Sequence, residues 1–313
     1  MDGTARHRGQ LPLLMLAGCL LALLVAPWAW RLFATLGWCE GQGEAGLEAF
    51  LKVVRRSLLL GLGLPIAIVV RPWREVPPSQ LGFVGPRARP LHGATTYGVT
   101  LLLGIAVLAL QHAAGWWRWR EDLDLGAALA RTARVALVPG LGVAIFEELI
   151  FRGWLEGRGE GPRRPVRTAL WVSAIYAALH AFRPRPLLVD VEPGTLGAFQ
   201  AVGAWFQRAL DPRVFGPTCL GLFLFGLVMS AACRRAGTVW ASIGIHAAGI
   251  TLLQAQEGWL VRTGQPAWSG TGRLLDGVPV MLLLLLAAWW LEPTRRKGAA
   301  SSSGVGDPRY GVG

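Results

Sequence analysis

The sequence contains little charge. Only 16% of its 313 residues are Asp, Glu, Lys or Arg, whereas about a quarter is usual in soluble domains. The hydrophobic share of 53% is close to the ordinary value of about half, so the missing charge is the more informative feature. Apolar stretches of about 18 or more residues, long enough to cross the hydrocarbon of a bilayer, recur along the chain. The composition therefore excludes an ordinary soluble domain and predicts a membrane protein.

The sequence also lacks closely spaced cysteines. Its four cysteines are widely spaced and include no CxxC pair, so no thiolate metal site is indicated. The net charge of +12 does not indicate nucleic-acid binding, because the basic residues lie in short blocks at the ends of apolar stretches, where they set membrane topology. We expect a lipid bilayer as a partner and no nucleic acid.

The apolar stretches predict an all-α protein, a polytopic transmembrane helical bundle with about eight spans. The predicted spans are residues 11–30, 51–70, 94–112, 131–155, 167–182, 215–233, 238–256 and 274–291. Lys52, Arg55 and Arg56 open the second stretch, which indicates that this helix begins at the membrane interface. The distribution of Lys and Arg predicts a cytoplasmic N-terminus.

This pattern divides the chain into four parts. N-terminal transmembrane helices occupy residues 1–129, a central set of helices occupies 130–256, and a last transmembrane helix occupies 257–292. The Ser/Gly-rich tail, 293–313, is expected to be disordered. A long insertion, 183–214, interrupts the central part, and the spacing of apolar residues over 196–210 predicts a surface-lying helix within it.

The candidate site begins with the segment EELIFR, which places Glu147, Glu148 and Arg152 in an otherwise apolar span. Ionisable residues inside a membrane are costly, so they usually pair, face a cavity or take part in chemistry. Glu148 and Arg152 are four residues apart with the acid first, a favourable spacing for a helical ion pair. Glu147 is rotated by about 100° from Glu148. We therefore expect Glu148 to be structural and Glu147 to be reactive.

Two histidines lie in other apolar spans. His180 ends the segment WVSAIYAALH, and His246 lies in VWASIGIHAAGI. At about 1.5 Å per helical residue, Glu147 lies roughly 12 Å from the cytoplasmic end of its span, His246 roughly 13 Å and His180 roughly 19 Å. Three helices are thus expected to bring one carboxylate and two imidazoles to similar depths.

This set of side chains is compatible with two kinds of hydrolytic site. A glutamate in an apolar environment can act as a general base toward water, with a histidine orienting the water or stabilising an oxyanion. Two histidines and a carboxylate also match a catalytic zinc shell, with Glu147, His180 and His246 as ligands. The sequence contains no HExxH motif, and it leaves both alternatives open: no required cofactor, or zinc.

The order of these motifs resembles that of the CPBP family of intramembrane proteases, also called the ABI family, which includes the CAAX prenyl endopeptidases. The family carries EExxxR, then an aromatic-xxx-His, then His-xxx-Asn on successive helices. Here EELIFR supplies the first motif, and YAALH supplies the second with Tyr176 in the aromatic place, which is usually Phe. HAAGI resembles the third, but Ile250 stands where the family usually has Asn. The resemblance covers roughly residues 130–256.

The resemblance implies an endopeptidase that cleaves a peptide bond near the C-terminus of a membrane-associated protein. Glu147 would activate water with help from His180, while His246 and the Asn would hold the oxyanion. Ile250 cannot donate a hydrogen bond, so Thr251 or Gln254 would have to substitute, or His246 would act alone.

The resemblance also suggests a location and a partner. Bacterial relatives include members similar to myxosortases, which suggests a bacterial inner-membrane location and a membrane-anchored substrate with a C-terminal sorting tag. Two other functions remain open. The departure at Ile250 is compatible with a non-catalytic immunity or scaffold protein of the same fold. A proton-coupled transporter using Glu147 is disfavoured by the lack of an internal repeat.

Overall fold

The computed structural model describes residues 11–39, 42–65, 82, 90–136, 140–157, 164–181, 191–209, 212–263, 274–275 and 277–292. The chain divides into two compact units. The first comprises Met1–Pro77 and Leu179–Gly216, and the second comprises Pro78–Ala178 and Pro217–Gly313. Almost all the described secondary structure is helical, which confirms the all-α class predicted from the sequence.

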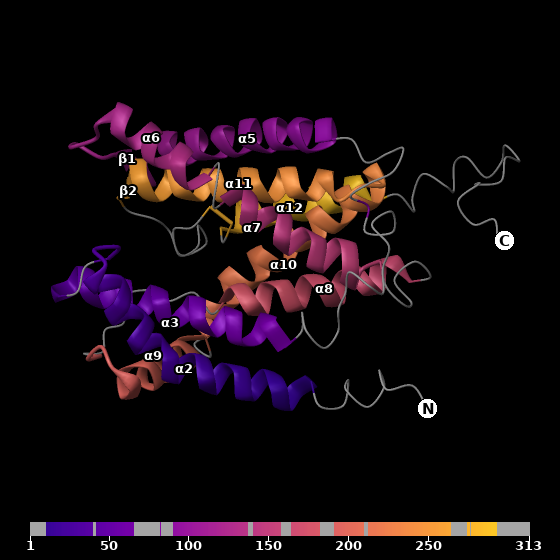
Figure 1. The fold of residues 1–313 in the computed structure, drawn as a ribbon. Helices are drawn as coiled ribbons and strands as arrows, with labels where there is room; N and C mark the ends of the chain where they lie inside the picture. Colours follow the sequence, from indigo (N-terminus) through magenta and orange to yellow (C-terminus); the bar gives the residue numbers. More distant parts are fainter. Residues whose placement is uncertain are drawn as a thin grey trace, which may run out of the picture. The chain divides into compact units, whose positions relative to one another are not determined.

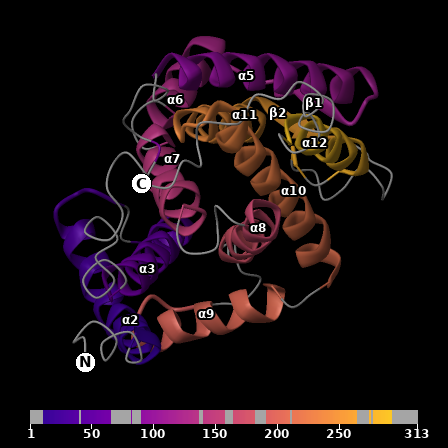
Figure 2. The same ribbon diagram turned by 90° about the vertical axis from the view of Figure 1, so that its right-hand side faces the viewer.

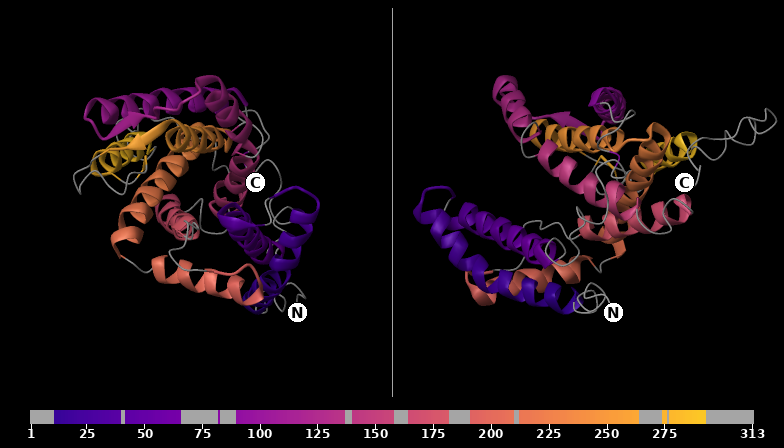
Figure 3. Two further views of the ribbon diagram at one scale, coloured as in Figure 1. Left: turned by 90° about the vertical axis from the view of Figure 1, so that its left-hand side faces the viewer. Right: turned by 45° about the vertical axis from the view of Figure 1, so that its right-hand side comes forward.

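Among the described residues, three helices lie wholly in the first unit: α2 (Leu11–Thr35), α3 (Gly43–Pro65) and α9 (Thr195–Ala209). Helices α2 and α3 lie side by side (Figure 3), and a Cβ at either Gly18 or Gly61 would collide with the carbonyl oxygen of the other. Such close approach needs small residues, as is common between membrane helices.

Helix α9 confirms the helix predicted over residues 196–210, within one residue at each end. Its buried face consists of Ala198, Ala201 and Trp205, which join the core formed with α2 and α3. Leu196 is 71% exposed on another face. The helix therefore packs through small residues and Trp205.

The second unit holds the remaining elements. In chain order they are α5 (Pro90–Ala113), β1 (Trp117–Trp119), α6 (Leu125–Val135), α7 (Leu141–Glu148), the π-helix η3 (Leu149–Leu155), α8 (Pro165–Ala181), α10 (Pro212–Ala236), α11 (Trp240–Trp259), β2 (Leu260–Arg262) and α12 (Val278–Leu291). Figure 1 labels these elements. The division between units falls in the last turn of α8 and the first turns of α10.

Helices α5 and α11 form a close seam in this unit (Figure 2). A Cβ at Gly244 would collide with the carbonyl oxygen of Gly93 and the hydroxyl oxygen of Thr96. The Thr96 hydroxyl donates to the carbonyl oxygen of Ala241 at 2.9 Å, so the seam has a polar link as well as close packing. It fixes the helix that carries His246.

The far ends of α5 and α11 are joined by a short antiparallel sheet. Trp117 pairs with Arg262 and Trp119 with Leu260 in the register of β1 and β2. Helix α6 then begins at Asp124, whose side chain accepts a hydrogen bond from the Ala127 amide at 3.0 Å. The sheet was not predicted, because three-residue strands carry no readable alternation.

Three described helices are long and apolar enough to cross a membrane: Leu13–Thr35, Pro90–Ala113 and Gly216–Ala236. They match the first, third and sixth predicted spans, while the eighth corresponds to the shorter apolar helix Val278–Leu291. The predicted count of eight spans is not confirmed. The fourth predicted span, 131–155, falls on α6, α7 and η3.

Two further expectations concern residues that the structure does not describe. The predicted disordered tail, 293–313, lies outside the described residues. So do residues 66–70 at the end of the second predicted span, because the described part of α3 ends at Pro65.

Candidate active site

The site is built on the helix that runs through α7 into η3. Glu148 ends α7, and Arg152 lies in η3, where the helix widens to π geometry. The Arg152 Nη1 donates to Glu148 Oε1 at 3.0 Å, and both side chains are 0% exposed. The ion pair predicted from the four-residue spacing is therefore present. Glu147 differs in environment, because its side chain is 23% exposed.

Arg152 has additional partners on two other helices. Its Nη2 donates to the carbonyl oxygen of Gly226 in α10 at 3.0 Å. Its guanidinium carbon lies 5.0 Å from the ring centroid of Tyr176 in α8, within cation–π range. One side chain thus holds three helices in a fixed arrangement around Glu148.

A chain of largely buried charges continues from Arg152. Its Nε lies 3.9 Å from Oε1 of Glu156, and the other carboxylate oxygen of Glu156 lies 3.6 Å from Nη1 of Arg234. Arg234 then binds Glu292 at 2.6 Å, after the end of α12. The Ser230 hydroxyl also donates to Glu156. Burial raises the pKa of the Glu156 carboxyl, while the neighbouring Arg152 and Arg234 act in the opposite direction.

His246 is oriented by Glu148. Its Nδ1 lies 2.9 Å from Oε1 of Glu148, the same oxygen that accepts from Arg152. A carboxylate paired with a guanidinium is an acceptor, so Nδ1 carries the hydrogen of this bond. The histidine is therefore held with Nε2 directed elsewhere, as in other sites where a carboxylate fixes an imidazole tautomer.

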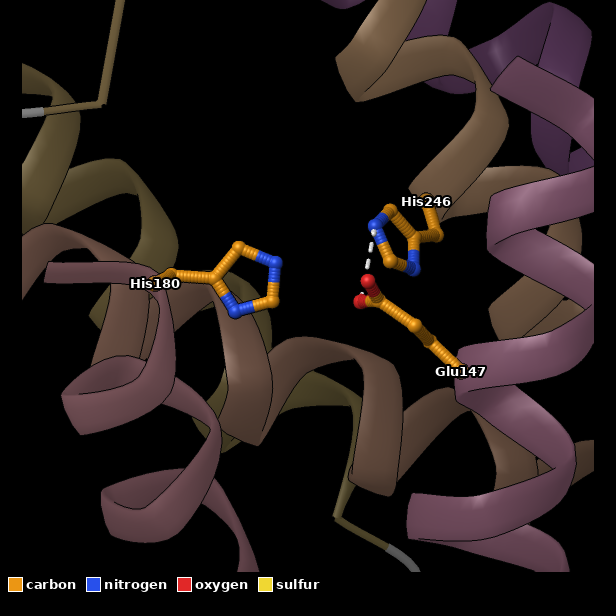
Figure 4. A group of neighbouring side chains, drawn as sticks. All are labelled: Glu147, His180 and His246. Carbon is orange, nitrogen blue, oxygen red and sulfur yellow. Dashed lines mark ion pairs between the residues drawn. The ribbon is translucent and has the colours of Figure 1, made fainter. Parts of the chain in front are cut away.

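The Nε2 side of His246 meets two further groups. Glu147 Oε2 lies 3.8 Å from Nε2, and Figure 4 shows the two side chains pointing toward each other from α7 and α11. The Tyr176 hydroxyl lies 3.5 Å from the same nitrogen. Sequence reasoning placed Tyr176 in the motif as an aromatic residue but missed the position of its hydroxyl.

His180 completes the predicted group from α8. One side-chain ligand atom from each of Glu147, His180 and His246 lies within 4.8 Å of the others. His180 belongs to the last turn of α8, a helix whose body lies in the second unit together with α7 and α11. Tyr176 and His180 are four residues apart in α8, so they lie on the same face of that helix.

Ile250 and the two residues considered as replacement donors, Thr251 and Gln254, have different surroundings in the structure. Ile250 packs in an apolar cluster with Ala144 and Ile243. The Thr251 hydroxyl lies 3.1 Å from the hydroxyl of Tyr97 and donates to a backbone carbonyl. Gln254 lines a separate cavity of about 350 Å³ with residues of α6. Thr251 thus has a partner on α5, and Gln254 lies beside α6.

The donor set of the three residues is compatible with a metal ion. Imidazole nitrogens and carboxylate oxygens are common zinc ligands. The three ligand atoms lie within 4.8 Å of one another, so small side-chain movements would bring each of them to about 2 Å from one ion. The contact from Nδ1 of His246 to Glu148 also matches the outer carboxylate that commonly accompanies a zinc-bound histidine. The residues therefore fit zinc, with Glu147, His180 and His246 as its ligands.

A comparison with protein families gives a match to part of the chain. Residues 129–250 match the family described as Rce1-like, type II CAAX prenyl endopeptidase. The match covers the helices that carry Glu147, Glu148, Arg152, His180 and His246. No curated protein and no solved structure matches the chain. The match confirms the resemblance drawn from the three motifs over this segment, and the long apolar helices agree with an integral membrane protein.

Proposed function

We propose that this chain is an intramembrane endopeptidase in which Glu147 activates a water molecule against a peptide carbonyl near the C-terminus of a membrane-anchored protein. The observation that carries the proposal is the difference in environment between two adjacent glutamates. Glu148 is fully buried and bound to Arg152 and His246, whereas Glu147 is 23% exposed and faces the Nε2 side of His246. We assign the activation of water to Glu147 and the orientation of His246 to Glu148.

The chemistry follows from these positions. The Glu147 carboxylate takes a proton from water as the water oxygen bonds to the carbonyl carbon. The carbonyl oxygen gains negative charge, and Nε2–H of the His246 imidazolium donates to it. Glu147 then returns the proton to the amide nitrogen as the carbon–nitrogen bond breaks, giving a carboxylic acid and an amine. His180 lies close enough to orient the water beside Glu147.

Zinc hydrolysis by the same three residues is the second candidate mechanism. It is favoured by the fit of the donor set and by the carboxylate behind His246. A bound zinc ion would supply Lewis acidity and a more acidic water. Glu148 would keep the same role in that case, because it would still fix the tautomer of His246.

The protease is proposed to lie in a bacterial inner membrane with its N-terminus in the cytoplasm. Its substrate is proposed to be a membrane-anchored envelope protein with a C-terminal hydrophobic sorting tag. The test is a proteomic comparison of membrane-protein C-termini in cells carrying wild type or Glu147→Gln. We expect specific C-termini to disappear in the mutant. Glu257→Gln, at an exposed carboxylate near the far end of α11, is the control and should leave them unchanged.

Identical C-termini in wild type and Glu147→Gln would overturn the protease proposal. An unaltered cellular phenotype of Glu147→Gln would then favour the non-catalytic immunity or scaffold role. Proton-driven flux in vesicles that is abolished by the same mutation would favour a transporter.

A further inference from the structure

We propose that the Tyr176 hydroxyl is a catalytic hydrogen-bond donor that stabilises the oxyanion together with Nε2–H of His246. This inference rests on the proposed endopeptidase function and adds a residue to it. The structural observation is the 3.5 Å distance from the Tyr176 hydroxyl oxygen to Nε2 of His246, on the side of the imidazole that faces Glu147.

The distance between the two donors suits a shared acceptor. At 3.5 Å the hydroxyl and Nε2 are at the outer limit of a mutual hydrogen bond. Two donors at this separation can both lie about 2.9 Å from a single oxygen atom placed between them. A hydroxyl hydrogen also rotates about its carbon–oxygen bond, so it can point to that oxygen while the ring stays in place.

The aromatic ring of Tyr176 is rigidly held, as a preorganised donor requires. Tyr176 is 2% exposed. Its ring meets Phe151 edge-on at a centroid distance of 5.4 Å and meets the His246 ring at 5.8 Å. The Arg152 guanidinium covers one of its faces at 5.0 Å. These three neighbours fix the direction in which the hydroxyl projects.

The residues that follow His246 in α11 explain why the Tyr176 hydroxyl matters in this chain. Ile250 follows His246 by one helical turn and has no hydrogen-bond donor in its side chain, while it packs among apolar residues of α7 and α11. Thr251 is hydrogen-bonded to Tyr97, and Gln254 lines the cavity beside α6. Among the side chains described around Nε2 of His246, Tyr176 supplies the hydroxyl.

The decisive comparison is between Tyr176→Phe and Tyr97→Phe. Tyr97 is a matched control, because its hydroxyl also contacts a side chain of α11, that of Thr251 at 3.1 Å. The probe is a quenched-fluorescent peptide that spans the bond identified by the C-terminal comparison, assayed with purified full-length protein in liposomes. We expect Tyr176→Phe to lower kcat by about 100-fold with KM within about twofold of wild type. We expect Tyr97→Phe to stay within about threefold in kcat.

A second measurement separates a catalytic donor from a structural one. A thioamide at the scissile bond replaces the developing oxyanion with sulfur, which accepts hydrogen bonds weakly. We expect the ratio of oxo to thio cleavage rates to be large in wild type and at least about fivefold smaller in Tyr176→Phe, because part of the donor contribution is already lost. A purely structural role of Tyr176 would lower both rates and leave the ratio unchanged.

The outcomes separate the inference from the function on which it rests. If wild type cleaves the peptide, Glu147→Gln does not, and Tyr176→Phe retains wild-type kcat, then the protease function stands and the role of Tyr176 is wrong. An unchanged oxo-to-thio ratio in Tyr176→Phe overturns the role as well, even if kcat falls. If Glu147→Gln cleaves as fast as wild type, the proposed function itself fails, and the inference fails with it.

Discussion

One carboxylate oxygen of Glu148 lies 2.9 Å from Nδ1 of His246 and 3.0 Å from Nη1 of Arg152. The imidazole belongs to α11 and the guanidinium to η3, so a single buried atom connects the helix that carries the proposed base with the helix that carries the proposed oxyanion donor. The orientation of His246 therefore depends on a charge pair that does not itself meet the substrate.

Replacing Glu148 with Gln should impair both stability and turnover. The mutation leaves the Arg152 charge buried opposite a neutral amide, and breaking a buried pair typically costs about 3–5 kcal/mol. The side-chain amide can turn either its oxygen or its NH2 group toward Nδ1 of His246, so the imidazole is no longer held in one tautomer. We expect kcat to fall by about 100-fold or more. Thermal unfolding in detergent and peptide cleavage measure the two effects.

The control for this mutation is Glu48→Gln. Glu48 pairs with Lys52 at the same four-residue spacing and at 2.7 Å, but its side chain is 65% exposed. We expect a stability change of less than about 0.5 kcal/mol there. Equal effects of the two mutations on stability would contradict the importance given to burial.

Arg152→Lys should fail although it retains the positive charge. An ammonium group cannot hold both Glu148 and the Gly226 carbonyl in the geometry of a guanidinium, and it loses planar contact with the Tyr176 ring. We expect a loss of more than about tenfold in kcat, because the hydrogen-bond partners of His246 both depend on Arg152. Wild-type turnover in this variant would contradict the role of Arg152 as the connecting residue.

Arg235→Lys provides the matched control. Arg235 also donates to a carbonyl, that of Trp290, and its guanidinium lies 4.5 Å from the Trp290 ring, but this interaction is exposed. We expect turnover within about twofold of wild type and a stability change below about 1 kcal/mol.

Gly244→Ala should separate α5 from α11. The added methyl group would collide with the Gly93 carbonyl and the Thr96 hydroxyl, and backbone cannot move aside cheaply. We expect a loss of about 1–3 kcal/mol in stability together with lower activity. Gly98→Ala on α5 should instead leave stability unchanged or raise it by up to about 1 kcal/mol, since no atom lies within 4 Å of the new methyl group.

Metal removal distinguishes the two candidate mechanisms. For the glutamate mechanism we expect protein dialysed against a chelator to keep full activity and to contain far less than one zinc ion per chain by mass spectrometry. Activity that is lost on dialysis and restored by zinc alone would instead establish Glu147, His180 and His246 as ligands. Binding of zinc to the chain, measured by calorimetry with wild type and His180→Ala, gives a readout that does not depend on cleavage.

The parts of the site that depend on local spacing could be predicted from the sequence. The Glu148–Arg152 pair follows from one helical turn, and the different direction of Glu147 follows from the helix rotation per residue. The approach of His246 to Glu147 followed from matching depths in separate spans. The roles of these residues in catalysis remain predictions.

The contacts that could not be predicted join distant segments. Glu148 and His246 are separated by 98 residues, and nothing in either segment states which glutamate the imidazole will meet. The hydroxyl of Tyr176 reaches His246 across 70 residues for the same reason. Glu156, Arg234 and Glu292 were also missed, because they lie at span ends, where charges are usually solvated.

The number of membrane spans was harder to infer than the helical class. The sequence shows where apolar stretches occur, but a helix buried among other helices and a helix facing lipid can have similar composition. Helix α11 illustrates the difficulty, because Ser242, His246 and Gln256 are buried in it beside apolar residues. Their polar groups lower its hydropathy without exposing it to water.

The glycine-lined seam of α5 and α11 also limits how a membrane-anchored substrate can reach the catalytic group from the side. Carbonyl oxygens and a threonine hydroxyl fill the seam where α11 meets α5, while Leu102 and Leu110 point outward from α5 and are about 70% exposed. A helical anchor diffusing in the plane of the bilayer would find a closed wall there. For the proposed membrane-anchored substrate, we therefore expect lateral entry on a side of the second unit other than the α5–α11 seam.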